Sequence, residues 1–188
     1  MRRRVFIAVL LSVLAAPRWC ATASADALRF RVQSEASEVI FHATSRLMNA
    51  EGRFQRVSGE VAVDPKDLTT AKIMLSIEAG SIDTGIGMRD SHLRSEDFFD
   101  VKRFPNITFE SVRVEATGRR ASVFGRLTVH GVTREIAVPV EVNVTDVAMV
   151  ATGEFVIDRR EYGLTYKSFL NPIGNDVRVI FTFRARSA

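Results

Sequence analysis

Apolar and polar residues alternate with a period of two through most of this chain after residue 25. The clearest run ends the chain, where Val177, Val179, Phe181, Phe183 and Ala185 share one face and mostly polar side chains stand between them. Such a run predicts a β-strand with one face on the core and the other in water. The other runs are 28–33, 57–64, 72–78, 122–129 and 135–144, with weaker candidates at 39–44, 107–115 and 149–158.

Short turn signals separate these runs, as at Asp64-Pro65, Thr117-Gly118 and His130-Gly131. Short connections between successive strands favour antiparallel pairing, and no run carries the helical repeat of a crossover connection. The remaining choice is a sandwich or a closed barrel, and single-sided strands in an unbroken meander favour the barrel. Two irregularities are expected. Pro139 removes a ladder donor and predicts a bulge or a gap in pairing, and a phase slip between Phe109 and Val112 predicts a bulge.

One segment, residues 81 to 105, breaks the alternation. Thr84 is positioned to cap a helix over about 86–94, Ser95 to cap a further turn, and Pro105 closes the segment. We therefore expect a short helical insertion around residues 84–99. Long excursions between strands of a compact domain are often functional, so the insertion is expected to act as a lid or plug.

The first 25 residues have the three regions of a secretory signal peptide. Arg2-Arg3-Arg4 is the basic region, 5–16 is the apolar region, and Ala23-Ser24-Ala25 is the cleavage site. The apolar region of 12 residues is short for a membrane span, which needs about 20. We expect residues 1–25 to be removed, by either the general or the twin-arginine export route, which leaves 26–188 as one domain with no membrane-spanning segment.

The charge of the chain argues against a nucleic-acid partner. The formal net charge is +4, but the four arginines of the first 25 residues account for it and leave 22 basic against 22 acidic residues. Phosphate binding needs a net basic surface or a dense basic patch. The length of 188 residues and the 46% hydrophobic content indicate one ordinary globular domain. Oligomeric state stays open, with a homodimer as one alternative.

Several spaced motifs closely resemble those of the YceI-like family of polyisoprenoid-binding proteins. They are Ser81-Ile-Asp-Thr-Gly, Arg89-Asp90-x-His92-Leu93, 97–100, 104–109, 125–133 and 158–163. The resemblance implies a lipocalin-like, extended eight-stranded antiparallel β-barrel that holds an isoprenoid or similar long-chain lipid, in the bacterial periplasm for exported members. The segments 42–51 and 166–174 depart from the family pattern. Both are candidates for the barrel mouth, which leaves the ligand's head group open.

The residues themselves also favour a lipid binder. The inward faces are Val, Ile, Leu and Phe, with Gly59 and Gly125 leaving room. An eight-stranded barrel is wide enough to be packed solid or to hold one slim ligand. We expect the interior and mouth to be lined by Phe54, Phe98, Phe99, Phe104, Phe109, Leu127, Val129, Val138, Val140, Phe155, Tyr162, Phe181 and Phe183. The phenylalanines of the insertion have a second interpretation, as a plug at one barrel end.

One charged cluster, Arg89, Asp90 and His92, has two interpretations. It is a polar latch that ties the insertion to the barrel rim, or Asp90 and His92 are the acid and base of a small enzyme acting on an apolar substrate. The three histidines do not have the spacing of a metal site, and no nucleophile or phosphate-loop motif occurs. The sequence therefore favours a binding protein without cofactor, with the enzyme as the alternative. Asp158, Arg159 and Glu161 are expected to form a turn and ion pairs at the rim.

Overall fold

The computed structural model describes residues 27–46, 49–166 and 172–188. The expected signal peptide, with Cys20 and Trp19, lies outside these residues. Within them, no helix has the length and apolar character needed to cross a membrane.

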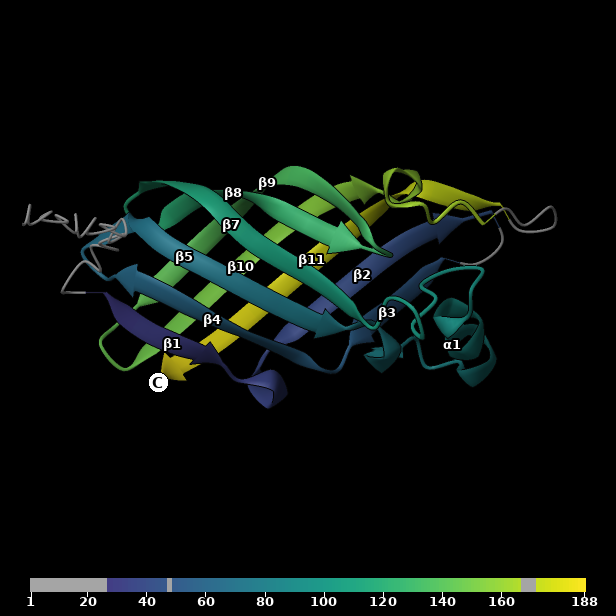
Figure 1. Cartoon of the computed structure of the whole chain (residues 1–188), viewed down its shortest axis with the longest axis horizontal. Coiled ribbons are helices and arrows are strands. Elements are labelled where there is room, and N and C mark those ends of the chain that lie inside the picture. Colours follow the sequence, from purple (N-terminus) through teal and green to yellow (C-terminus); the bar gives the residue numbers. More distant parts are fainter. Residues whose placement is uncertain (1–26, 47–48, 167–171) are drawn as a thin grey trace, which may run out of the picture.

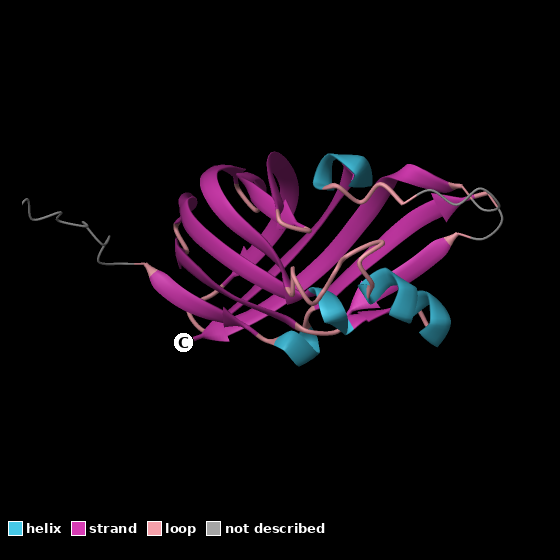
Figure 2. Cartoon of the chain, turned by 45° about the vertical axis from the view of Figure 1, so that its right-hand side comes forward, coloured by secondary structure: helices cyan, strands magenta, loops and turns pink. Residues whose placement is uncertain are grey.

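Strands make up most of the described chain, and the helical segments are short (Figure 2). The eleven strands of the described residues are β1 Leu28–Val32, β2 Glu38–Ser45, β3 Ala50–Phe54, β4 Val57–Asp64, β5 Asp67–Glu78, β6 Ile82–Asp83, β7 Asn106–Thr117, β8 Arg120–Val129, β9 Val132–Val144, β10 Ala148–Asp158 and β11 Ile173–Ser187. The helix α1 is Gly87–Arg94, and the 3-10 turns are η1 Ser34–Ala36, η2 Ala79–Ser81 and η3 Arg159–Tyr162.

Eight of these strands close a barrel. The antiparallel order β1-β4-β5-β7-β8-β9-β10-β11 returns on itself because β11 also pairs with β1, for example at Phe30↔Ser187. The remaining three strands lengthen the same barrel. Strand β2 follows β1 and pairs with β11, β3 pairs with β2 and leads into β4, and β6 follows β5 and pairs with β3. The turn η1 separates β1 from β2, and the turn η2 separates β5 from β6. The predicted eight-stranded antiparallel barrel is confirmed.

Both predicted irregularities are present. The β9–β10 ladder ends at Val140↔Gly153, so pairing stops next to Pro139, which has no amide hydrogen to donate. Beyond that point η3 packs against β9, and Arg134 Nε donates to the Glu161 carbonyl at 3.2 Å. The phase slip also produces a bulge, since the β7–β8 register shifts between Ser111 and Arg113.

The alternation of the sequence places apolar side chains inside and ion pairs outside. Phe30, Val63 and Ile82 are almost completely buried. On the outer face Arg126 bonds Glu110 at 2.8 Å, across neighbouring strands. Gly125 does not leave the empty space that the sequence suggested. A Cβ there would lie 2.4 Å from Phe109 Cζ, so the ring of Phe109 occupies the space over the glycine.

The two ends of the barrel differ. One end carries the C-terminus, β1 and the tight β4–β5, β7–β8 and β9–β10 turns, whereas α1 lies at the other end (Figure 1). At the α1 end the β5–β7 ladder stops at Glu78↔Asn106, and β6 pairs with β3. The chain between β6 and β7 forms the insertion, residues 84–105, which lies where the ladder has ended.

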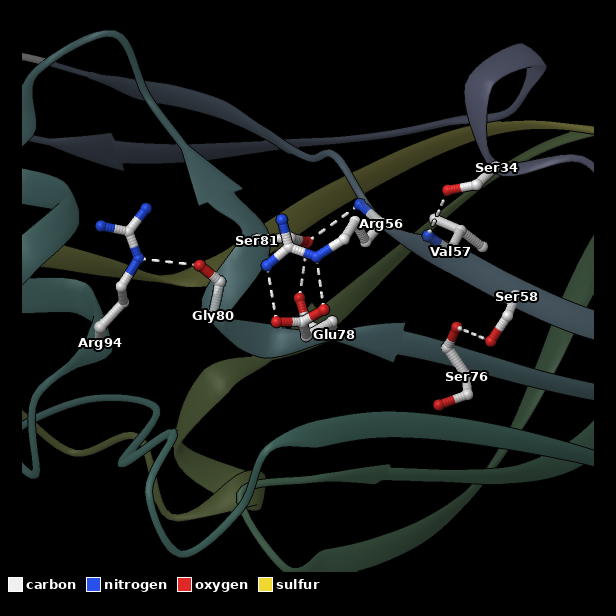
Figure 3. A network of polar contacts seen from close by, with 9 residues as sticks. All are labelled: Ser34, Arg56, Val57, Ser58, Ser76, Glu78, Gly80, Ser81 and Arg94. Atoms are coloured by element: carbon white, nitrogen blue, oxygen red, sulfur yellow. Dashed lines mark hydrogen bonds and ion pairs between the residues drawn. The ribbon is translucent and has the colours of Figure 1, made fainter.

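Hydrogen bonds fix the base of the insertion to η2. Arg94 Nε donates to the Gly80 carbonyl at 2.9 Å, and Ala79 N donates to the Pro105 carbonyl at 2.9 Å. Figure 3 shows Arg94 reaching Gly80, beside the ion pair of Arg56 with Glu78. The predicted helix of residues 86–94 agrees with α1 within one residue. Its predicted cap is wrong, because Ile86 is the N-cap residue and Thr84 bonds to Asp90 instead.

Candidate functional site

Two adjoining cavities lie inside the barrel. The smaller cavity has a volume of about 130 Å³ and lies toward the barrel end that carries the C-terminus, with Val63, Val142 and Met149 in its wall. The larger has a volume of about 580 Å³ and lies at the insertion end, with Ala50 and Ile173 in its wall. The cavities share six lining residues, so they follow one another inside the barrel: Val39, Ile77, Ile107, Leu127, Phe155 and Val179.

Most of the side chains expected in the interior do line these cavities. Phe54, Phe98, Phe99 and Val129 line the larger one. The smaller one is lined by Phe109, Val138, Val140, Phe181 and Phe183, and both are lined by Leu127 and Phe155. The period of two therefore located the inward face of β7 to β11 correctly, because a strand residue points inward whenever its second neighbour does.

Phe104 and Tyr162 are exceptions, and neither lines a cavity. Phe104 packs on the β8–β9 turn, where its ring lies 4.7 Å from that of His130 and covers Gly131. Tyr162 is 1% exposed on η3, and its hydroxyl has no hydrogen-bond partner among the described residues. Burial raises the pKa of Tyr162 to about 12. Both residues lie outside the alternating strands, where the period gives no direction.

Phe98 and Phe99 of the insertion make aromatic contacts and also line the larger cavity. Phe99 meets Phe54 edge to face at 5.9 Å between ring centroids. Phe98 lies 4.7 Å from Tyr166 and 5.0 Å from His92. The two interpretations of Phe98 and Phe99, as a plug and as cavity lining, therefore describe the same packing.

The polar cluster of the insertion divides into two parts. Asp90 Oδ1 accepts hydrogen bonds from Thr84 N at 2.9 Å and Thr84 Oγ1 at 2.5 Å, and Arg89 donates to Thr84 Oγ1 at 2.8 Å and its carbonyl at 2.9 Å. Thr84 in turn lies over Gly52 of β3. His92 is separate, with Nε2 at 3.4 Å from Asp97 Oδ2. In the described residues no hydrogen bond joins Asp90 to His92, so Asp90 does not orient the imidazole.

Arg159 was expected in an ion pair at the rim, but it is buried instead. It is 6% exposed, lines the larger cavity and donates to the carbonyls of Leu164, Ile173 at 3.2 Å and Gly174 at 2.9 Å. The expected rim ion pair is made by Arg160, whose guanidinium holds the pKa of Asp158 down at about 2. Loss of hydration lowers the pKa of Arg159 from its usual value. Two adjacent arginines look alike in sequence, and only the packing decides which one points inward.

The site offers an apolar channel with a polar end. In the described residues no three His, Cys, Asp or Glu side chains gather as a metal site would require. The fold and the cavities together define a small, lipocalin-like barrel with an apolar internal channel. A model of the YceI-like domain matches residues 30–185, and the chain belongs to that family.

Similar proteins agree with this assignment. The chain is 40% identical over 87 residues to the UPF0312 protein PA0423 of Pseudomonas aeruginosa, a match that covers 46% of each chain. The match thus spans about half the length of this curated relative. Among solved structures, BcnA of Burkholderia cenocepacia is 25% identical, with a TM-score of 0.75 over 81% of this chain and 98% of that one. A polyisoprenoid binding domain from Saccharophagus degradans shares the fold at 20% identity, with a TM-score of 0.72 over 86% of this chain and 99% of that one.

Proposed function

We propose that this protein binds one long apolar lipid, a polyisoprenoid, inside the barrel and carries it across the periplasm. The chain of the lipid occupies the larger cavity and extends into the smaller one. The signal-peptide pattern of residues 1–25 supports export and a periplasmic location.

The two adjoining cavities carry this proposal. The volume of the larger, about 580 Å³, falls within the range of roughly 300–1,000 Å³ for small-molecule sites. If each methylene takes about the 30 Å³ of a water molecule, it has room for roughly 20 of them. The smaller cavity has an apolar wall except for Thr108, so it suits the end of a hydrocarbon chain.

The energetics favour tight binding. Burial of one methylene contributes about 0.8 kcal/mol, so a dozen contribute roughly 10 kcal/mol before ordering costs are subtracted. Carriage makes and breaks no bond, which agrees with the engagement of Asp90 by Thr84 rather than by His92. The shared fold with the Saccharophagus degradans polyisoprenoid binding domain supports the choice of lipid class.

The test is organic extraction of the protein purified from the periplasm of its native host, followed by mass spectrometry. We expect one long-chain lipid per protein molecule. Ala43→Trp fills part of the larger cavity, since Ala43 lines it. Ala137→Trp is the matched control, because Ala137 is exposed on β9 and lines neither cavity.

The proposal predicts loss of the lipid from Ala43→Trp and its retention in Ala137→Trp. A wild-type protein that carries no lipid and binds none when prenols are added would overturn it. So would equal lipid in the two variants, because the lipid would then lie outside the cavity.

A further inference from the structure

The polar residues at the insertion end of the larger cavity carry an uneven set of charges. Arg89, His92 and Arg159 all line it. No Asp or Glu is part of that lining in the portion of the chain that the structure describes. The end of an otherwise apolar channel is therefore cationic.

The nearby carboxylates are already engaged elsewhere. Asp158 accepts hydrogen bonds from Arg160 Nε at 3.0 Å and Arg160 Nη2 at 2.5 Å. Its negative charge is therefore paired with Arg160 rather than with Arg159. Asp90 accepts from Thr84, and Asp97 faces His92. Within the described residues neither Arg89 nor Arg159 forms an ion pair.

Both arginines keep donors available. A guanidinium has five N–H groups in a planar fork. Arg89 uses its Nε and Nη2 on Thr84, and Arg159 uses three nitrogens on carbonyls of η3–β11 and the start of β11. Both arginines line the same cavity, and α1 approaches the chain that follows η3, where the His92 ring lies 4.9 Å from that of Tyr166.

We infer that the ligand ends in an oxyanion, a carboxylate or a phosphate, which binds Arg89 and Arg159 at the insertion end while its apolar chain runs toward the smaller cavity. This rests on the proposed function. A buried cation without a countercharge is costly, and its attraction for an anion grows in a low-dielectric cavity. The arginine fork matches carboxylate and phosphate oxygens in pairs, whereas an alcohol leaves the charge uncompensated.

The experiment compares ligands that differ only in the head group. Geranylgeranyl phosphate is measured against geranylgeraniol, and oleate against oleyl alcohol, by competition with a fluorescent fatty-acid probe on delipidated protein. We expect at least one anionic member to bind tenfold or more tightly than its alcohol, which corresponds to about 1.4 kcal/mol. The two pairs distinguish a phosphate from a carboxylate.

Variants at one position separate charge from packing. Arg89→Gln should reduce the preference for the anion over the matching alcohol to less than threefold. Arg89→Lys should keep most of the preference. Arg103→Gln is the matched control, because it removes the same charge from the same insertion. The Arg103 side chain is 75% exposed and lines neither cavity.

The outcomes separate this inference from the proposed function. Equal affinity for alcohol and anion in both pairs, with tight binding throughout, overturns the head-group inference and leaves lipid carriage standing. An equal loss of preference in Arg89→Gln and Arg103→Gln also overturns it, because net charge would then explain the effect. Failure of all four ligands to bind overturns the proposed function itself.

Discussion

Replacing Phe181 by alanine tests whether the barrel interior is a ligand space or a packed core. Phe181 is 7% exposed, and its ring stacks on that of Phe183 at 5.0 Å. It also lines the smaller cavity, so one side of the ring already faces a void of about 130 Å³. Phe30 is the matched control, since it is 0% exposed and lines neither cavity.

The expected losses differ because the two rings lose different contacts. A phenylalanine truncated in a solid core costs about 3–5 kcal/mol, which combines lost burial with a new void. Phe181 already adjoins a void, so we expect its truncation to cost about 2 kcal/mol, near the burial contribution alone. At roughly 2–4 °C per kcal/mol, this lowers the melting temperature of the delipidated protein by about 4–8 °C. Phe30→Ala should cost about 4 kcal/mol and lower it by about 8–16 °C.

Lipid should then separate the variants further. A ligand present at 100 times its Kd stabilises the native state by about 2.7 kcal/mol. Thermal melts of delipidated and lipid-loaded protein measure the shift, which we expect in wild type and to at least the same size in Phe181→Ala, where the chain fills the enlarged space. Equal losses in Phe181→Ala and Phe30→Ala, with no lipid-dependent shift in either, would refute the reasoning and indicate a solid barrel.

Three further predictions address other parts of the molecule. The pKa of Tyr162 is raised to about 12 from about 10 in the unfolded chain, so its contribution to stability is complete below pH 10 and is lost as the pH rises toward 12. Urea unfolding between these pH values should show a smaller loss for Tyr162→Phe than for wild type, and equal losses would count against the assignment. Asp90→Ala removes the acceptor of Thr84 and should increase hydrogen exchange across residues 84–99 without unfolding the barrel, whereas unchanged protection would leave Asp90 without a holding role. The intact mass of the periplasmic protein should correspond to a chain that starts at Asp26, and a mass that includes residues 1–25 would contradict export by a cleaved signal.

The positions of the two strand irregularities could be read from nearby residues. Pro139 lacks a donor wherever it lies, so the pairing gap beside it followed from its chemistry. The bulge at Val112 followed from a phase slip, because a bulge adds one residue to one strand only. The inward positions of Phe181 and Phe183 followed from strand pleating in the same way.

The candidate site was only partly predictable, since its polar end depends on partners that are distant in the chain. Asp90 was expected beside His92, yet it bonds Thr84 six residues earlier, while His92 meets Tyr166 of the β10–β11 connection. Arg159 and Arg160 have the same chemistry, and only their surroundings differ. Phe104 appeared equivalent to Phe98 and Phe99, but it packs on a turn of distant strands.

Pattern and backbone chemistry alone thus specified an all-β chain, nine of the eleven strands of the described residues, their inward faces and the helical insertion. A period of two, a missing amide hydrogen and a phase slip act within a few residues, whereas the short strands β3 and β6 gave no such signal. Closure was decided by the tertiary structure, in which β1 meets β11 across nearly the whole domain at Val32↔Ala185. Only that closure creates the channel. It also fixes which arginine is buried against it, since burial is a property of the assembled walls rather than of any single strand.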